Sequence, residues 1–230
     1  MLQKELKKYF SVQDRNKKLK PTKTVKFAIW SITAIETCPQ RTKKCEKLCY
    51  VLKAYKQYPN CKPCHDKNYK FSQSDDFVPY MINYFENRLK SIHRNNQTLL
   101  VRIHESGDFY SVEYINKWYE IAKHFESDES IKFYTYTKSI NLMLASKFFK
   151  IGHGFEFLPN FKINFSVWDD TDTFSLHIIK KYNLPTYTAD TAENLKTEKY
   201  KGFARCNCVS CGTCAMCANW KVKNIACEIH

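Results

Sequence analysis

Short apolar runs alternate with amphipathic stretches along most of this chain. The runs are rich in β-branched and aromatic residues, which is the pattern of β-strands. They cover residues 24–32, 98–104, 130–137, 161–168 and 184–190. Apolar residues occupy both odd and even positions of these runs, so we expect both faces of each strand to be covered, as in a parallel sheet.

The stretches between the runs predict helices, because their apolar residues recur at spacings of three and four. The clearest covers residues 75–93, and further helices are expected over 112–126, from residue 139 to 149, and over 170–182. Polar residues at the expected helix starts are candidate N-caps. These are Ser74, Ser111, Ser139 and Asp170.

Strand followed by helix, repeated along the chain, predicts an α/β fold with a parallel sheet. Five to six βα units are too few for a closed eight-stranded barrel of ~250 residues. We therefore expect a partial, open parallel β/α barrel, with a doubly wound sheet as the alternative. Residues 1–23 are expected to form a basic arm, 24–200 the barrel domain, and 201–230 a cysteine-rich, metal-binding extension packed on that domain.

The chain is strongly basic, with 37 Lys and Arg residues against 23 Asp and Glu residues and a net charge of +14. Such a charge favours a polyanionic partner, nucleic acid first, although a lysine-rich chain can simply be soluble. No apolar run approaches the ~18 residues of a membrane span. The charged N-terminus lacks an apolar signal core. We expect a protein of the bacterial cytoplasm without a membrane partner, whose protein partners the sequence does not predict.

Polar residues follow each predicted strand, and in parallel α/β folds the ligand site lies beyond the carboxyl ends of the strands. We predict four catalytic candidates at this rim: His104, Glu105, Asp108 and Lys138. Trp168 and Asp169, after the fourth strand, are candidates for cofactor contacts. Ser106 and Gly107 complete an SGD turn, where glycine lets the backbone approach a ligand closely.

The chain has 11 cysteines, and in the reducing cytoplasm thiols favour metal ligation over disulfides. Cys38, Cys45 and Cys49 follow the first strand. Three thiolates on one loop suit a 4Fe–4S cluster with one open iron better than structural zinc, which takes four protein ligands. Cys61 and Cys64 form a CxxC pair, which is half of a zinc or cluster site or a redox pair.

A third cysteine group lies near the C-terminus and consists of Cys206, Cys208, Cys211, Cys214 and Cys217. Its two-residue spacings match the first three positions of the ferredoxin pattern, but the last gap is short and no proline follows. We expect one or two 4Fe–4S clusters in this chain, with zinc as the alternative metal. Cys227 is expected in the apolar core.

With these residues in view, the chain resembles the phage gene product 88 family. Three blocks carry the resemblance: "TCPQRTKKCEKLCY", then "RIHESGDFYSVEYINKW" with the following "FYTYTKS", and finally "CVSCGTC" ending in "IACEIH". The family comprises phage and mobile-element proteins of largely uncharacterised activity.

A second, weaker resemblance is to radical S-adenosylmethionine enzymes, although their usual CxxxCxxC spacing is absent. It implies that Cys38, Cys45 and Cys49 hold a cluster whose open iron binds the amino acid end of S-adenosylmethionine. Ser106–Asp108 would then lie near the cofactor amine. We expect an iron–sulfur enzyme of this type acting on or with nucleic acid. The alternative is a non-enzymatic, DNA-binding or host-regulatory protein with structural clusters or zinc.

Overall fold

The computed structural model describes residues 19–206 and 210–229. Seven strands of this part of the chain form one sheet in which every neighbouring pair is parallel. Their order across the sheet is β1 (Val25–Trp30), β2 (Thr98–Ile103), β3 (Ile131–Thr137), β6 (Phe161–Val167), β7 (Thr186–Asp190), β9 (Asn224–Glu228) and β8 (Ala204–Cys206). β1 and β8 are free edges, so the sheet is an open half-barrel, and the predicted partial parallel β/α barrel is confirmed.

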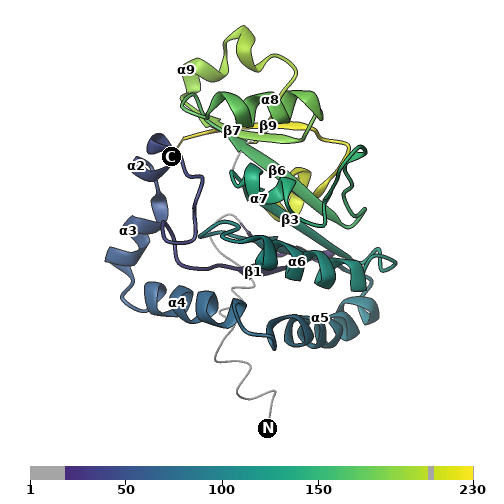
Figure 1. Ribbon diagram of the computed structural model, residues 1–230. Helices are drawn as coiled ribbons and strands as arrows, with labels where there is room; N and C mark the ends of the chain where they lie inside the picture. The colour runs from purple at the N-terminus through teal and green to yellow at the C-terminus, as the bar shows by residue number, and fades with distance from the viewer. Residues whose placement is uncertain (1–18, 207–209, 230) are drawn as a thin grey trace.

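The helices follow the strands along the chain. They are α2 (Lys43–Lys47), α3 (Tyr50–Gln57), α4 (Cys61–Ser72), α5 (Phe77–Arg94), α6 (Val112–His124), α7 (Ile140–Leu144), α8 (Thr173–Lys181), α9 (Ala192–Leu195) and α10 (Cys211–Cys214). Two 3-10 turns, η1 (Glu198–Tyr200) and η2 (Met216–Ala218), and a short antiparallel pair, β4 (Phe149–Lys150) and β5 (Gly154–Phe155), complete the described elements. Figure 1 shows α5 and α6 beside the β1–β3 end of the sheet and α8 beside β7 and β9.

One of the four candidate N-caps behaves as predicted. The Ser111 hydroxyl accepts a hydrogen bond from the first turn of α6. Ser139 occupies the N-cap position of α7 without capping it. Ser74 lies two residues before the N-cap of α5, and Asp172 rather than Asp170 caps α8. The last two predictions were wrong because each helix begins about two residues later than its periodicity indicates, a usual uncertainty at helix ends.

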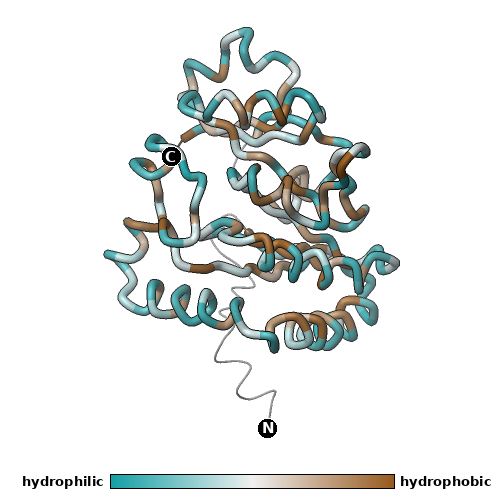
Figure 2. The backbone as a smooth tube through the Cα atoms, in the orientation of Figure 1, coloured by the Kyte–Doolittle hydropathy of each residue, from teal (hydrophilic) through white to brown (hydrophobic). Residues whose placement is uncertain are grey.

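The two faces of the sheet have different coverings. Alternate residues of β1 and β2, such as Trp30 and Val101, pack with α5 and α6 in the larger core. The residues between them, such as Phe27 and Leu100, form a second core with Ala218 of the C-terminal segment. Since successive side chains of a strand point to opposite faces, the helices cover the outer face and the cysteine-rich segment covers the inner face. Figure 2 shows the apolar residues along the strands and on one side of α5 and α6.

The C-terminal cysteine segment is therefore built into the sheet. β8 and β9 extend the sheet beyond β7, and the chain between them crosses the inner face, where η2 contacts β3 and β6. Cys227 is buried in β9, as predicted. Nearly all of the predicted N-terminal arm lies outside the described residues. Within the described part of the chain, no helix has the length and apolar character that a membrane span requires.

Candidate metal centre

Three of the predicted rim residues meet at the carboxyl ends of β1, β2 and β3. The buried Asp108 carboxylate accepts hydrogen bonds from Thr137 Oγ1 at 2.6 Å and from the Lys138 backbone N–H at 2.9 Å. Burial raises the pKa of Asp108, and burial together with the Asp108 charge raises the pKa of the Cys38 thiol to about 12. Lys138 Nζ donates to Ser166 Oγ at 3.0 Å. A protonated thiol, an acid and an amine therefore share this part of the rim.

The SGD turn fixes the first cysteine loop to the sheet. Ser106 Oγ donates to the Ile32 carbonyl at 2.8 Å, and the Ile32 N–H donates to the Ser106 carbonyl at 3.0 Å. Gly107 has φ +85°, and a Cβ there would lie against Ile32 and 2.6 Å from Thr37 Oγ1. Glycine is needed both for this conformation and for the close approach. The buried Ser106 and the half-buried Gly107 thus pack against the loop that carries Cys38.

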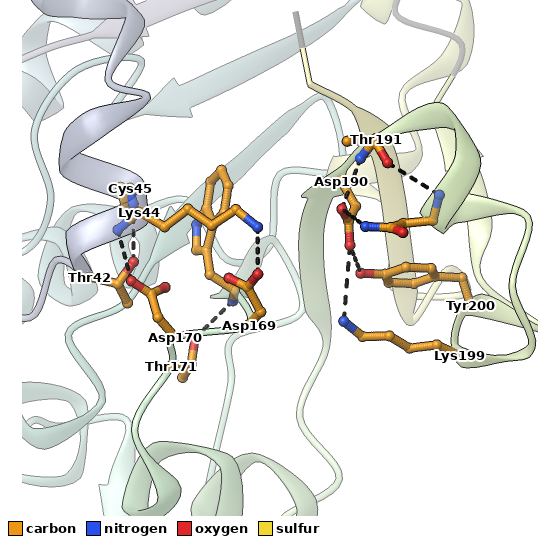
Figure 3. Close-up of polar contacts among 12 residues, drawn as sticks. Thr42, Lys44, Cys45, Asp169, Asp170, Thr171, Asp190, Thr191, Lys199 and Tyr200 are labelled. Atoms are coloured by element: carbon orange, nitrogen blue, oxygen red, sulfur yellow. Dashed lines mark hydrogen bonds and ion pairs between the residues drawn. The ribbon is translucent and has the colours of Figure 1, made fainter.

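A second set of contacts fixes the same loop to the residues that follow β6, the central strand of the sheet (Figure 3). The Lys44 backbone N–H in α2 donates to Asp170 Oδ2 at 2.7 Å, and Lys44 Nζ pairs with Asp169 Oδ2 at 2.6 Å. Lys44 Nζ and Lys138 Nζ lie 5.9 Å and 5.8 Å from the centroid of the Trp168 ring. Thr42 caps α2 through the Cys45 N–H. We predicted Trp168 and Asp169 as cofactor contacts. In the structure they hold α2, the short helix that carries Cys45, in place.

The other end of the rim contains Asp190, also drawn in Figure 3. Its carboxylate accepts hydrogen bonds from the Tyr200 hydroxyl at 2.5 Å, from Asn194 Nδ2 at 2.8 Å and from the Thr191 N–H at 2.8 Å. These contacts tie α9 and η1 to the end of β7. Asp190 is thus used in fixing the connection between β7 and β8.

His104 and Glu105 lie apart from the group formed by Cys38, Asp108 and Lys138. His104 has φ +66° and is 4% exposed, and its ring is hydrogen bonded to Tyr114 Oη at 3.0 Å and to Thr135 Oγ1 at 3.4 Å. Burial lowers its pKa to about 3, so the ring is neutral. The Glu105 carbonyl accepts a hydrogen bond from the Tyr50 hydroxyl. The sequence signal that grouped all these residues was only their position after a strand.

The CxxC pair occupies the first turn of α4. Cys61 Sγ lies 3.9 Å from His65 Nε2, and His65 Nδ1 lies 2.9 Å from the Tyr55 hydroxyl. Burial lowers the pKa of His65 to about 4, which keeps its ring neutral and able to accept a proton or a metal. Cys64 lies one turn after Cys61 on the same helix and is partly exposed.

The C-terminal cysteines gather on the inner face. Cys206, Cys211, Cys214 and Cys217 line one cavity together with Tyr134 and Tyr136 of β3. Burial and the neighbouring Cys206 and Cys211 raise the pKa of Cys217 to about 12, although a hydrogen bond from Tyr136 opposes the increase. Cys208 lies outside the described residues.

Two residues of β6 that sequence reasoning missed hold this segment in place. Lys162 is 1% exposed, and its Nζ donates to three backbone carbonyls on either side of Cys217. These are Met216 at 3.1 Å, Asn219 at 2.9 Å and Val222 at 2.6 Å. Asn164 Nδ2 donates to the Cys217 carbonyl at 3.0 Å. The signal was present in the sequence as two polar residues, two positions apart, inside the apolar run "FKINFSVW".

The donor set fits a thiophilic metal, because thiols favour iron–sulfur clusters and zinc. The candidate ligand side chains lie farther apart than they would around a bound metal ion. Among residues 19–206 and 210–229, no three Cys, His, Asp or Glu side chains converge closely enough to hold a metal ion. The Cys38 and Cys217 thiols are protonated at neutral pH. Metal binding would have to displace these protons and draw the thiols together.

The similarity of this chain to known proteins lies at the level of a protein family. No curated protein and no solved structure shows significant similarity to this chain. The model of one family, described as Gene product 88, matches residues 5–219, which include the predicted cysteine groups and the whole rim. The chain therefore belongs to the gene product 88 family.

Proposed function

We propose that this protein binds iron–sulfur clusters through two cysteine groups and acts as a radical S-adenosylmethionine-like enzyme on or with nucleic acid. The observation that carries the proposal is the cavity lined by four cysteines against Tyr134 and Tyr136 on the inner face of the half-barrel. Four thiols around one cavity are the donor set of a 4Fe–4S cluster. Cys208, outside the described residues, is a further candidate ligand.

The first cysteine group supports a second cluster, at the rim. Its loop is fixed on one side by the SGD turn and on the other by Asp169 and Asp170. The three cysteines of this loop, Cys38, Cys45 and Cys49, are all partly exposed. A reduced 4Fe–4S cluster there would supply the electron for cleavage of S-adenosylmethionine.

The chain's own residues would position the substrate around that cluster. The Asp108 carboxylate is held by three donors, from Thr137, Lys138 and Phe109, and it sets the charge beside Cys38. The Lys138 amine, partly exposed beside Trp168, can hold a negative group of a ligand or move a proton at Nζ. The net charge of +14 supports a nucleic acid as the larger substrate or partner.

Cleavage of S-adenosylmethionine by reconstituted protein, under anaerobic conditions with dithionite, tests the enzymatic part. We expect 5′-deoxyadenosine from the wild-type chain and none from Cys38→Ser/Cys45→Ser/Cys49→Ser. Cys227→Ala is the matched control, because this buried cysteine lies outside both groups. A chain that carries full clusters but releases no 5′-deoxyadenosine would leave the non-enzymatic alternative.

Binding to a short DNA or RNA duplex at several salt concentrations tests the second part. If the positive charge contacts phosphates, the logarithm of the association constant falls linearly with the logarithm of the salt concentration. Binding that is absent at low salt, or unaffected by salt, would remove nucleic acid from the proposal.

A further inference from the structure

Arg102 of β2 places on the inner face a positive charge whose Nε has no hydrogen-bond partner in the described part of the chain. β2 alternates, with Leu99, Val101 and Ile103 in the outer core and Leu100 in the inner core. Arg102 therefore points inward with Leu100. Its Nε is shielded from solvent and has no hydrogen-bond acceptor within the described residues. A buried N–H without an acceptor is rare in native structures, since most such groups are paired.

The described groups around Arg102 favour its charge but supply no hydrogen-bond acceptor for its Nε. Its guanidinium carbon lies 5.3 Å from the centroid of the Tyr136 ring. Burial raises the pKa of Tyr134 and of Tyr136, so both phenols are neutral. The Tyr50 hydroxyl donates to the Glu105 carbonyl, which keeps its proton on the oxygen. The nearby Glu105 carboxylate favours the charge of Arg102 and helps to raise its pKa, but among residues 19–206 and 210–229 it is not within ion-pair distance of the guanidinium.

The position of Arg102 is central to the chemistry of the inner face. Tyr136, whose ring contacts the guanidinium, is hydrogen bonded to Cys217 of the C-terminal group, and Arg102 itself acts on the Cys217 thiol. Tyr50, another neighbour of the guanidinium, directly follows Cys49 of the first group. Arg102 therefore neighbours residues of both cysteine groups, where a bound ligand would contact both regions.

We propose that Arg102 binds an oxyanion, a carboxylate or a phosphate group, of a ligand that occupies the inner face between the two cysteine groups. A guanidinium presents its Nε–H and Nη–H donors as a planar fork that matches two oxygens of such a group. The cation–π contact with Tyr136 helps to hold the guanidinium in place before the ligand arrives. This anion site is distinct from the proposed clusters. Anion binding to it can be measured independently of the cluster content.

Thermal unfolding of the full chain, purified anaerobically, provides the first test. Inorganic phosphate and acetate are titrated at an ionic strength kept constant with sodium chloride. We expect a saturable rise in Tm with at least one of the two, and the tighter one identifies the group as phosphate or carboxylate. In Arg102→Gln the apparent Kd should rise about tenfold or more, as expected for loss of a charge-assisted pair.

Arg94→Gln is the matched control, since it removes the same charge from an exposed position at the end of α5. It should bind both anions like the wild type. Arg102→Lys keeps the charge but loses the fork, and it should bind more weakly than the wild type. If neither anion gives a saturable shift, or if Arg94→Gln weakens binding as much as Arg102→Gln, the proposal is overturned.

A measurement on the unmodified sequence keeps the test valid if Arg102→Gln does not fold. Phenylglyoxal modifies arginine, and peptide mass spectrometry gives the rate at each position. The binding anion should slow modification of Arg102 about tenfold or more at saturation, with less than a twofold change at Arg94. Equal rates with and without either anion would refute the site. Iron content, measured on the same samples, shows separately whether the cluster proposal holds.

Discussion

Replacing Lys162 with methionine tests how the inner-face cysteine segment is held. The change keeps most of the side-chain volume and removes three N–H donors from the Met216, Asn219 and Val222 carbonyls. A hydrogen bond from a charged donor contributes about 1.5–3 kcal/mol, so three give roughly 5–9 kcal/mol before other terms. Burying an ammonium group offsets several kcal/mol of this. We therefore expect Lys162→Met to lower the free energy of unfolding by about 2–4 kcal/mol.

Urea unfolding followed by circular dichroism measures this loss, and native-state alkylation shows where it acts. Among the described residues, the Val222 carbonyl accepts a hydrogen bond only from Lys162. The segment around Val222 should therefore open most when Lys162 is replaced. Cys217 should react with iodoacetamide roughly tenfold faster or more. Lys132→Met, at an exposed position of β3, is the control and should change stability by less than about 0.5 kcal/mol. If Lys162→Met shows the same free energy of unfolding and the same Cys217 alkylation rate as Lys132→Met, the three Lys162 hydrogen bonds do not hold the segment.

Three further predictions concern the rim and the loops. Burial lowers the pKa of His104 to about 3, so the unfolded chain binds a proton that the folded chain does not as the pH falls below 6.5. Between pH 7 and 4.5 the wild type should lose roughly 2–3 kcal/mol more than His104→Gln, measured by urea unfolding; equal losses would contradict this. Gly107→Ala should cost about 2–4 kcal/mol. Gly152→Ala, also at positive φ but with open space, should cost only about 1–2 kcal/mol, and equal costs would disprove the close packing. Asp170→Ala should expose Cys45 to faster alkylation, because α2 loses its anchor; an unchanged rate would show that the anchor does not hold the loop.

The repeating units of the fold were predictable because their signals are local. The five apolar runs correspond to β1, β2, β3, β6 and β7, and the amphipathic stretch 75–93 corresponds to α5. β8 and β9 were missed. β8 has only three residues, and the five residues of β9 were interpreted as part of a cysteine segment rather than as a strand. Such short strands are specified by pairing, of β9 with β7 and of β8 with β9, which the local pattern does not contain.

The candidate site was predictable as a region and not in its details. Position after a strand correctly grouped Asp108 and Lys138 with Cys38, because parallel strands end at one edge. It could not show that a positive φ turns His104 into the core. Charged residues inside apolar runs were the better signal. Arg102 in "TLLVRIH" and Lys162 in "FKINF" mark the two places where the inner face uses a charge.

The metal content of the full chain, purified anaerobically, tests the central claim most directly. Iron, sulfide and zinc analysis should be combined with Mössbauer spectroscopy. Two 4Fe–4S clusters predict about eight iron and eight sulfide per chain, and about four of each after Cys38, Cys45 and Cys49 are changed to serine. Serine at Cys206, Cys211, Cys214 and Cys217 should remove the other four. A colourless chain that contains zinc, or no metal at all, would contradict the account.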